Sequence, residues 1–174
     1  LDCGCNYGFY SFFTASLSDK NFIIAIEASP KTAEDFKKNL SINNFNNILL
    51  KNSAISDTDG ETVIFNESKN DWESSLSHSK FENTTVTNIK TNKIDTILGS
   101  YNLEGYFLFI KLDIEGHELQ AIKGGINIII KHNPIFIIEL SKYIFENNHE
   151  NFLFFKNFLI NFDYNIYDTN NKHI

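Results

Sequence analysis

Apolar runs and amphipathic segments alternate along the chain in a pattern that predicts an α/β fold. Short runs rich in isoleucine, leucine and phenylalanine predict strands at residues 22–26, 48–51, 107–110 and 135–138. Segments with the periodicity of amphipathic helices predict helices at residues 9–17, 31–43, 126–131 and 150–161. Strands that alternate with helices are typical of a mainly parallel sheet with helices on both faces.

The run at residues 107–110 has no polar interruption, so we expect a central parallel strand that is buried on both faces. Parallel α/β sheets bind ligands at the carboxyl ends of such strands. Five polar residues follow this run closely: Lys111, Asp113, Glu115, His117 and Glu118. We place Glu115 and Glu118 in the first turn of the next helix, where the helix dipole favours negative charge, and we expect Gly124 and Gly125 to end it.

Weaker signals fill the rest of the chain. We predict short strands at residues 62–65 and 86–90, a turn at 57–60, a short helix at 93–98 and a sixth strand at 164–167. The helix at 150–161 carries a stripe that we assign to the core, made of Phe152, Phe155, Leu159 and Phe162. The polar stretch at 66–85 is long for a connection, and its Trp72 either covers a ligand or anchors the loop on the rim.

The first eight residues indicate the end of a strand, a tight glycine turn and the start of a helix. Gly4 and Gly8 allow backbone conformations that other residues avoid, and they let a ligand approach the main chain closely. A dinucleotide fingerprint would place further glycines at positions 6 and 9, where the chain has Asn6 and Phe9. The pattern is instead Asp-x-Gly-x-Asn-x-Gly, beginning at Asp2.

The second predicted strand ends in Glu27, about 20 residues after the glycine turn, and Ser29 and Pro30 start the next helix. A carboxylate at this place can accept hydrogen bonds from both hydroxyls of a ribose, or it can be a solvated turn residue. Because the glycine turn and the spacing coincide, we favour the ribose role. The segment 52–55, at the end of the third strand, is where the base of a cofactor could lie.

Length and charge limit the possible partners. The chain has 174 residues, which fits one domain over residues 1–174. Its formal charge of −7 and the lack of a long basic run argue against a nucleic-acid partner, so we expect a small or neutral substrate. All 15 cationic residues are lysines, so no arginine is available to bind a phosphate in a bidentate way.

No apolar run is as long as a membrane span, and the opening lacks the features of a signal peptide, so we expect a cytoplasmic protein. Cys3 and Cys5 are too close for an ordinary disulfide and lack the second ligand pair of a zinc site. We therefore interpret them as small side chains that pack the turn, and we predict no metal site. The chain has no methionine and starts inside a predicted strand, so we expect a fragment.

Four segments together resemble the FkbM-type family of S-adenosylmethionine-dependent methyltransferases: LDCGCNYGFYS, IAIEASP, KLDIEGHELQAIKGG and PIFIIEL. The resemblance covers nearly the whole chain, and KLDIEGHE is its most specific part; Cys5 replaces the alanine that is usual in the first segment. It implies a three-layer Rossmann-like methyltransferase fold that is truncated at both ends.

The resemblance also implies the site. Asp2, Gly4, Asn6 and Gly8 would line the methionine part of S-adenosylmethionine, Glu27 would bind its ribose, and Asn52, Ser53 and Ala54 would flank its adenine. The acceptor would be a hydroxyl of a sugar, a lipid or a small metabolite.

Methyl transfer to an alcohol needs an acceptor held close to the methyl carbon, and a base is useful because an alcohol has a high pKa. The candidates are Asp113, Glu115 and His117. Each has a simpler alternative: Asp113 could orient the cofactor, Glu115 could cap a helix, and His117 could be a solvated helix residue. Glu139 could complete the pocket or pair with a lysine, and two nearby carboxylates could raise one another's pKa or recruit a cation.

Two other functional classes stay open. A nucleotide-binding oxidoreductase would use a similar turn and ribose carboxylate, but it would have a different glycine pattern. A noncatalytic protein that keeps the fold would bind the cofactor without transferring its methyl group.

Overall fold

The computed structural model describes residues 1–67, 85–146 and 148–173. These residues belong to two units, Leu1–Leu140 and Ser141–Ile174. The first unit contains the glycine turn, the acidic residues and every predicted strand except the last.

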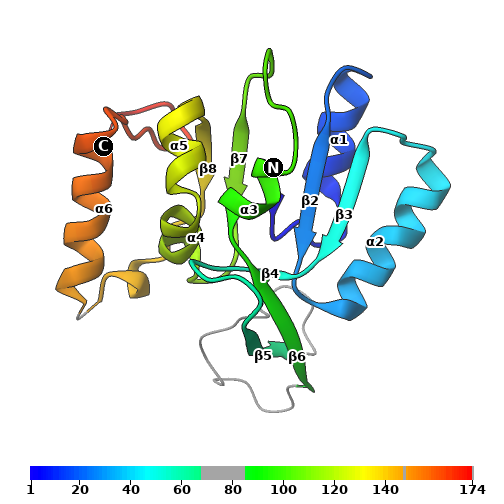
Figure 1. Ribbon diagram of the computed structural model, residues 1–174, viewed down its shortest axis with the longest axis horizontal. Helices are drawn as coiled ribbons and strands as arrows, with labels where there is room; N and C mark the ends of the chain where they lie inside the picture. The colour runs from blue at the N-terminus through cyan, green and yellow to red at the C-terminus, as the bar shows by residue number, and fades with distance from the viewer. Residues whose placement is uncertain (68–84, 147, 174) are drawn as a thin grey trace. The chain divides into compact units, whose positions relative to one another are not determined.

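The central sheet of the first unit has five strands, all parallel. Their order in space is β3 (Ile48–Asn52), β2 (Ile23–Glu27), β1 (Asp2–Cys3), β7 (Phe109–Leu112) and β8 (Ile135–Ile138). Figure 1 labels four of them, and β3, β2, β7 and β8 follow one another there in this order. The chain builds outward from β1 to β3 and then returns to the other side of β1 with β7. The mainly parallel sheet that the alternating pattern predicts is therefore confirmed, and its order reverses between β1 and β7.

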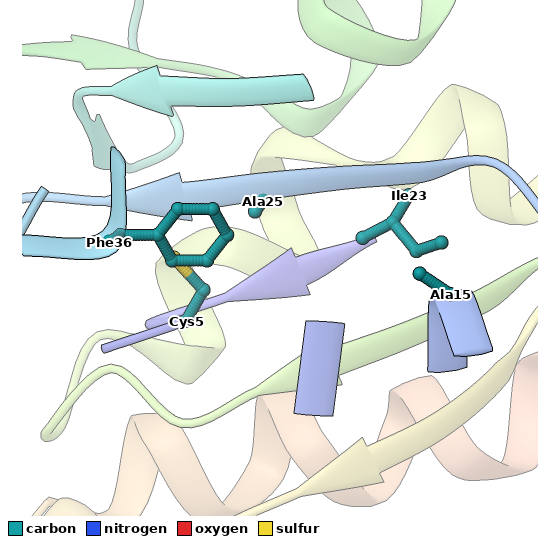
Figure 2. Packing of buried hydrophobic residues seen from close by; sticks show 5 residues of the cluster. All are labelled: Cys5, Ala15, Ile23, Ala25 and Phe36. Atoms are coloured by element: carbon teal, nitrogen blue, oxygen red, sulfur yellow. The ribbon is translucent and has the colours of Figure 1, made fainter. Parts of the chain in front are cut away.

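Helices α1 (Phe9–Leu17) and α2 (Pro30–Asn43) pack on one face of this sheet. Proline stands in the first turn of α2, and the Ser29 side chain caps that helix by accepting a hydrogen bond from the amide of Thr32. Figure 2 shows the core beneath them, in which Cys5 and the ring of Phe36 meet alanine and isoleucine side chains of α1 and β2. Cys3 and Cys5 are both free and buried, as expected for side chains that pack the turn.

The other face of the sheet is also covered. Ile24 and Ile26 alternate along β2 with the residues that face α1 and α2, and both are buried. Helices α3 (Ile94–Gly99), α4 (Glu118–Gly124) and α5 (Ile126–His132) follow, and α3 packs against both α4 and α5. Burial of β2 at all five positions agrees with a three-layer arrangement.

A small second sheet forms between β3 and α3. Its order is β4 (Ala54–Ile55), β6 (Thr85–Asn92) and β5 (Thr62–Glu67), with β5 antiparallel to β6. The predicted strands at 62–65 and 86–90 and the predicted helix at 93–98 are confirmed, with ends that differ by a few residues. Residues 68–84 of the long polar stretch, with Trp72, lie outside the described residues.

The strand predicted at residues 107–110 lies two residues further along, and its expected burial on both faces is wrong. Ile110 and Leu112 are fully buried on one face of β7, whereas Phe109, on the other face, is 50% exposed. Phe109 pairs with Ile135 of β8, which is also exposed. An unbroken apolar run therefore does not distinguish a strand that is buried on both faces from a strand that is buried on one face.

The second unit contains a 3₁₀ helix (Lys142–Ile144) and α6 (His149–Asn161). Among the side chains that the structure describes in this unit, Phe155 and Phe158 are buried, whereas Phe152 is 49% exposed, so the predicted core stripe is only partly correct. The sixth strand predicted at 164–167 is also wrong. The Tyr164 ring stacks on Phe158 of α6, with ring centroids 5.2 Å apart. The alternating polarity of residues 164–167 therefore reflects packing against α6 and not the pairing of a strand in the sheet.

Candidate functional site

Two loops of the first unit meet where the strand order reverses. One follows β1 and contains the glycine turn, and the other follows β7 and leads from Asp113 to His117. Gly4 has a φ of 73°, and a β-carbon at this residue would collide with the backbone carbonyl oxygen of Asp113. Only glycine allows this approach, so the spacing of the two loops depends on it.

The glycine turn is held by backbone hydrogen bonds. The amides of Gly4 and Cys5 both donate to the carbonyl of Ile26 at the end of β2, each over 3.0 Å. Gly8 has a φ of 96° at the start of α1, where a β-carbon would collide with the Phe12 ring. Because Gly4 and Gly8 have no side chains, the main chain of the turn is not covered at the edge where the carboxyl ends of the strands lie.

Glu27 ties this turn to the next loop. Its Oε2 accepts a hydrogen bond from the amide of Asn6, and its Oε1 accepts one from the amide of Ser29, each with a donor–acceptor distance of 2.9 Å. Burial raises the pKa of Glu27, and hydrogen bonds from the backbone amides of Ser29, Asn6 and Ala28 oppose that shift. A carboxylate has about four acceptor sites, so Glu27 can both fix the loops and accept a further hydrogen bond from a ligand.

The segment after β3 is fixed to the same strand end. The side-chain amide of Asn52 donates to the carbonyls of Glu27 and Ala28, over 2.8 and 3.1 Å. The backbone amide of Ser53 also donates to the Glu27 carbonyl, over 3.1 Å. The first of the three predicted adenine-flanking residues therefore positions the other two, Ser53 and Ala54.

A cavity of about 560 Å³ lies at this edge of the sheet, a size typical of small-molecule and cofactor sites. Eight of the eleven predicted site residues line it: Gly4, Asn6, Glu27, Ser53, Ala54, Asp113, Glu115 and His117. Figure 1 shows the carboxyl ends of β2, β3 and β7 gathered at one edge, facing the small sheet. Five of the eight predicted cofactor residues and all three predicted catalytic residues therefore share one cavity.

Three predicted residues lie behind the lining: Asp2, Gly8 and Asn52. Asp2 is buried and accepts a hydrogen bond of 2.6 Å from the Ser11 hydroxyl, which joins β1 to α1. Gly8 starts α1, and Asn52 holds the ends of β2 and β3 together. These residues shape the cavity from beneath.

Two polar atoms in the cavity wall have no hydrogen-bond partner among the described residues: Asn6 Oδ1 and Ser53 Oγ. Buried polar groups are nearly always paired, so such atoms call for a ligand or water. An amide oxygen and a hydroxyl can together accept from and donate to a nucleoside.

At the other end of the cavity, three carboxyl groups converge. Oxygen atoms of Asp113, Glu115 and Glu139 lie within 4.8 Å of one another. At this separation Asp113 can share a hydrogen bond with Glu139, and this contact raises the pKa of Glu139. Glu139 therefore completes the pocket, which was one of the two alternatives that the sequence left open.

Lys111 lies beside this group, and sequence reasoning gave it no role. Its ammonium is 2.9 Å from Asp113 Oδ2 and 3.6 Å from Asp2 Oδ1, and it donates to the Gly4 carbonyl over 3.2 Å. It also lies over the Tyr10 ring, 5.2 Å from the centroid. Burial lowers the pKa of Lys111, but the two aspartates outweigh this effect and raise it above its ordinary value.

Tyr10 and Phe9 line the cavity as well, and the sequence analysis missed both. Their rings meet edge to face with centroids 5.5 Å apart, and they are 53% and 75% exposed. The available signal was an aromatic pair directly after the glycine turn, which helical periodicity alone assigned to an amphipathic helix.

The loop after β7 differs from the prediction at Glu115. This residue has a φ of 53° and precedes α4, so its placement in the first helical turn is wrong, whereas Glu118 does begin the helix. Glu118 is buried, and its Oε1 accepts hydrogen bonds from the amides of Ile114 and Gly116. That carboxylate reaches back to hold a loop with two left-handed residues, so Glu115 turns toward the cavity.

His117 occupies the N-cap position of α4 and lines the cavity, so it is more than a solvated helix residue. Burial lowers the pKa of His117, and this effect outweighs the opposite one of Asp57. The imidazole is therefore neutral near pH 7 and able to accept a proton.

A parallel sheet with this strand order and a cavity at its point of reversal defines a Rossmann-like α/β domain. A model of the methyltransferase FkbM domain matches residues 2–166. The chain therefore belongs to the FkbM methyltransferase family.

The fold is similar to the crystal structure of methyltransferase FkbM from Methylobacillus flagellatus KT, with a TM-score of 0.59 and 20% sequence identity. The alignment covers 92% of this chain and 36% of that chain, so this chain spans little more than a third of its length. No curated protein sequence matches. Among the described residues, no helix has the length and hydropathy to cross a membrane.

Proposed function

We propose that this chain is the cofactor-binding and catalytic part of an S-adenosylmethionine-dependent O-methyltransferase. The observation that carries the proposal is one cavity with a glycine turn and Glu27 at one end and a cluster of carboxyl groups at the other. Membership of the FkbM methyltransferase family supports the reaction class.

The residues of the cavity fit this cofactor. Glu27 offers acceptor lone pairs for the ribose hydroxyls, and Ser53 and Ala54 lie beside it for the adenine. The bare main chain near Gly4 and the unpartnered oxygen of Asn6 suit the polar amino-acid part. When bound, the cofactor supplies an electrophilic methyl group on a sulfonium.

The acidic end suits an acceptor hydroxyl. Asp113 and Glu115 can orient the hydroxyl by accepting its hydrogen bond, and His117 offers a neutral nitrogen nearby. Phe9 and Tyr10 also line the cavity and offer apolar surface to an acceptor. We infer a small hydroxylated molecule as the acceptor.

Calorimetric titration tests the cofactor part of the proposal. S-adenosylmethionine should bind the whole chain in preference to a nicotinamide dinucleotide. Glu27→Ala should weaken that binding by about 1.5–3 kcal/mol, roughly 10- to 150-fold, because charge-assisted hydrogen bonds to the ribose are lost.

The matched control is Glu34→Ala, which removes an exposed glutamate of α2 and should leave affinity unchanged. Because Glu27 also holds two backbone amides, the melting temperature of each variant should be measured beside its affinity. Unchanged affinity in a folded Glu27→Ala chain would contradict the ribose role.

A further inference from the structure

Asp113 and Glu139 form a directly joined pair of carboxyl groups. They follow Leu112 of β7 and Ile138 of β8, which are partners in the parallel register, and the Glu139 amide donates to the Leu112 carbonyl over 2.9 Å. The backbone therefore holds the two side chains next to each other. Their carboxyl oxygens lie within 4.8 Å of each other, and a hydrogen bond between them requires a proton, because an ionised carboxylate can only accept.

The surroundings decide which carboxyl group holds that proton. Burial would raise the pKa of Asp113, but its hydrogen bonds with Glu139 and with the Lys111 ammonium outweigh burial and lower that pKa. On the other side, the hydrogen bond with Asp113, then burial, and then the negative charges of Asp113, Glu115 and Glu118 raise the pKa of Glu139 to about 7. Because the Lys111 ammonium lies 2.9 Å from Asp113 Oδ2 and favours the ionised form of that group, the proton belongs to Glu139.

Glu139 also has a route to solvent. It is exposed, whereas Asp113 and Glu115 are half-buried. The ionisable groups around it are Lys111 from β7, then Asp113, Glu115 and His117 from the following loop, and Glu118 from α4. A carboxylate with a proton affinity suited to neutral pH and contact with water can take up a proton in each turnover and release it afterwards.

Resting on the methyl transfer proposed above, we propose that Glu139 is the catalytic base for the acceptor hydroxyl, with Asp113 and Lys111 as the residues that position it and set its proton affinity. The acceptor oxygen forms a bond to the methyl carbon while the bond from that carbon to the sulfonium sulfur breaks. The electron pair of the broken bond stays on sulfur, which becomes a neutral thioether. The hydroxyl proton passes to the Glu139 carboxylate and then to water.

The first test does not depend on turnover. In the whole chain labelled with ¹³C at glutamate carboxyl carbons, one glutamate should titrate close to pH 7 in NMR spectra. That signal should be missing in Glu139→Gln and present in the matched control Glu104→Gln, which alters an exposed glutamate before β7. A wild-type chain in which every glutamate titrates at ordinary acidic pH would overturn the proposal.

A second variant covers the case in which Glu139→Gln does not fold. Asp113→Asn removes the neighbouring negative charge, so the neutral titration should move to lower pH. A titration that stays in place would show that the pair does not share the proton.

The second test uses turnover. In the wild type, kcat/KM should rise with pH, with a midpoint at about pH 7. Glu139→Gln should abolish this rise, which is the limb of the profile that reports the base, and it should lower the rate by at least about 10²-fold. Lys111→Gln should move the limb to higher pH, because the ammonium favours the doubly ionised pair. Glu104→Gln should keep the wild-type profile.

The outcomes separate the two proposals. A wild type that transfers methyl groups, beside a Glu139→Gln variant with the same profile and rate, would overturn the role of Glu139 alone. Loss of activity in chelator with recovery in magnesium would also overturn it, because a cation would then replace the shared proton. A chain that binds S-adenosylmethionine but methylates no acceptor would overturn the proposed function, while the NMR titration would still report the shared proton.

Discussion

The two ends of the cavity are built in different ways. At the turn end, the contacts involve the main chain: Gly4 and Cys5 donate to Ile26, and the Glu27 carboxylate accepts from backbone amides. At the acidic end, Asp113 contacts both Lys111 and Glu139 through its side chain. Changes at the turn end should therefore damage fold and function together, whereas changes at the acidic end should affect the chemistry and leave the fold intact.

The largest effect is expected for Gly4→Ala. The substitution places a β-carbon in a left-handed conformation, at about 1–2 kcal/mol, and forces the loop after β7 to move, at about 1–3 kcal/mol more. Urea unfolding should show a loss of about 2–5 kcal/mol, and cofactor binding should fall with it.

Gly60→Ala is the control for that prediction. Gly60 has nearly the same φ, 74°, but nothing lies within 4 Å of the place that a β-carbon would take, so only the conformational cost of about 1–2 kcal/mol applies. Equal losses in the two variants would mean that the contact between the two loops contributes nothing.

The second prediction concerns the acidic end. Asp113→Asn and Glu115→Gln keep the shape of the side chain and remove its charge, so each should lower kcat by about 10²-fold or more with little change in melting temperature. Glu115→Gln should leave cofactor affinity nearly intact, because Glu115 is not among the residues predicted to bind the cofactor.

His117→Ala is the comparison for both variants, since it separates proton transfer from simple placement in the same loop. A Glu115→Gln variant with the wild-type rate but a much lower melting temperature would make Glu115 a structural residue of the loop.

The sequence predicted the turn end better than the acidic end, for a physical reason. Glycine, proline and an acidic strand end impose local backbone geometry, so the turn at Gly4, the start of α2 at Pro30 and the position of Glu27 followed from residue type and spacing.

The acidic end depends on contacts between distant strands. Lys111 and Asp113 share a face because they alternate along the strand direction, but only the pairing of β7 with β1 and β8 places Asp2 and Glu139 beside them. The left-handed conformation of Glu115 could not be predicted either, because it depends on the reach of Glu118 back to Ile114 and Gly116. Side-chain reach of this kind leaves no periodic signal.

The smallest expected effect is on the free energy of unfolding, which should depend on pH through the Glu139 carboxyl group. The pKa of Glu139 rises from an ordinary value of 4.5 to about 7 on folding, so the folded chain holds a proton that the unfolded chain has lost between these pH values. Stability should therefore fall as pH rises through this window, and it should be unaffected by Glu139 below about 4.5.

Glu139→Gln mimics the protonated group, because its amide can donate to Asp113 at every pH. Urea unfolding should show no difference from wild type at pH 4.5 and a gain at pH 8, limited to about 1 kcal/mol because water screens an exposed carboxylate. Glu104→Gln should show no such pH dependence, and a gain that is the same at both pH values would place the proton elsewhere.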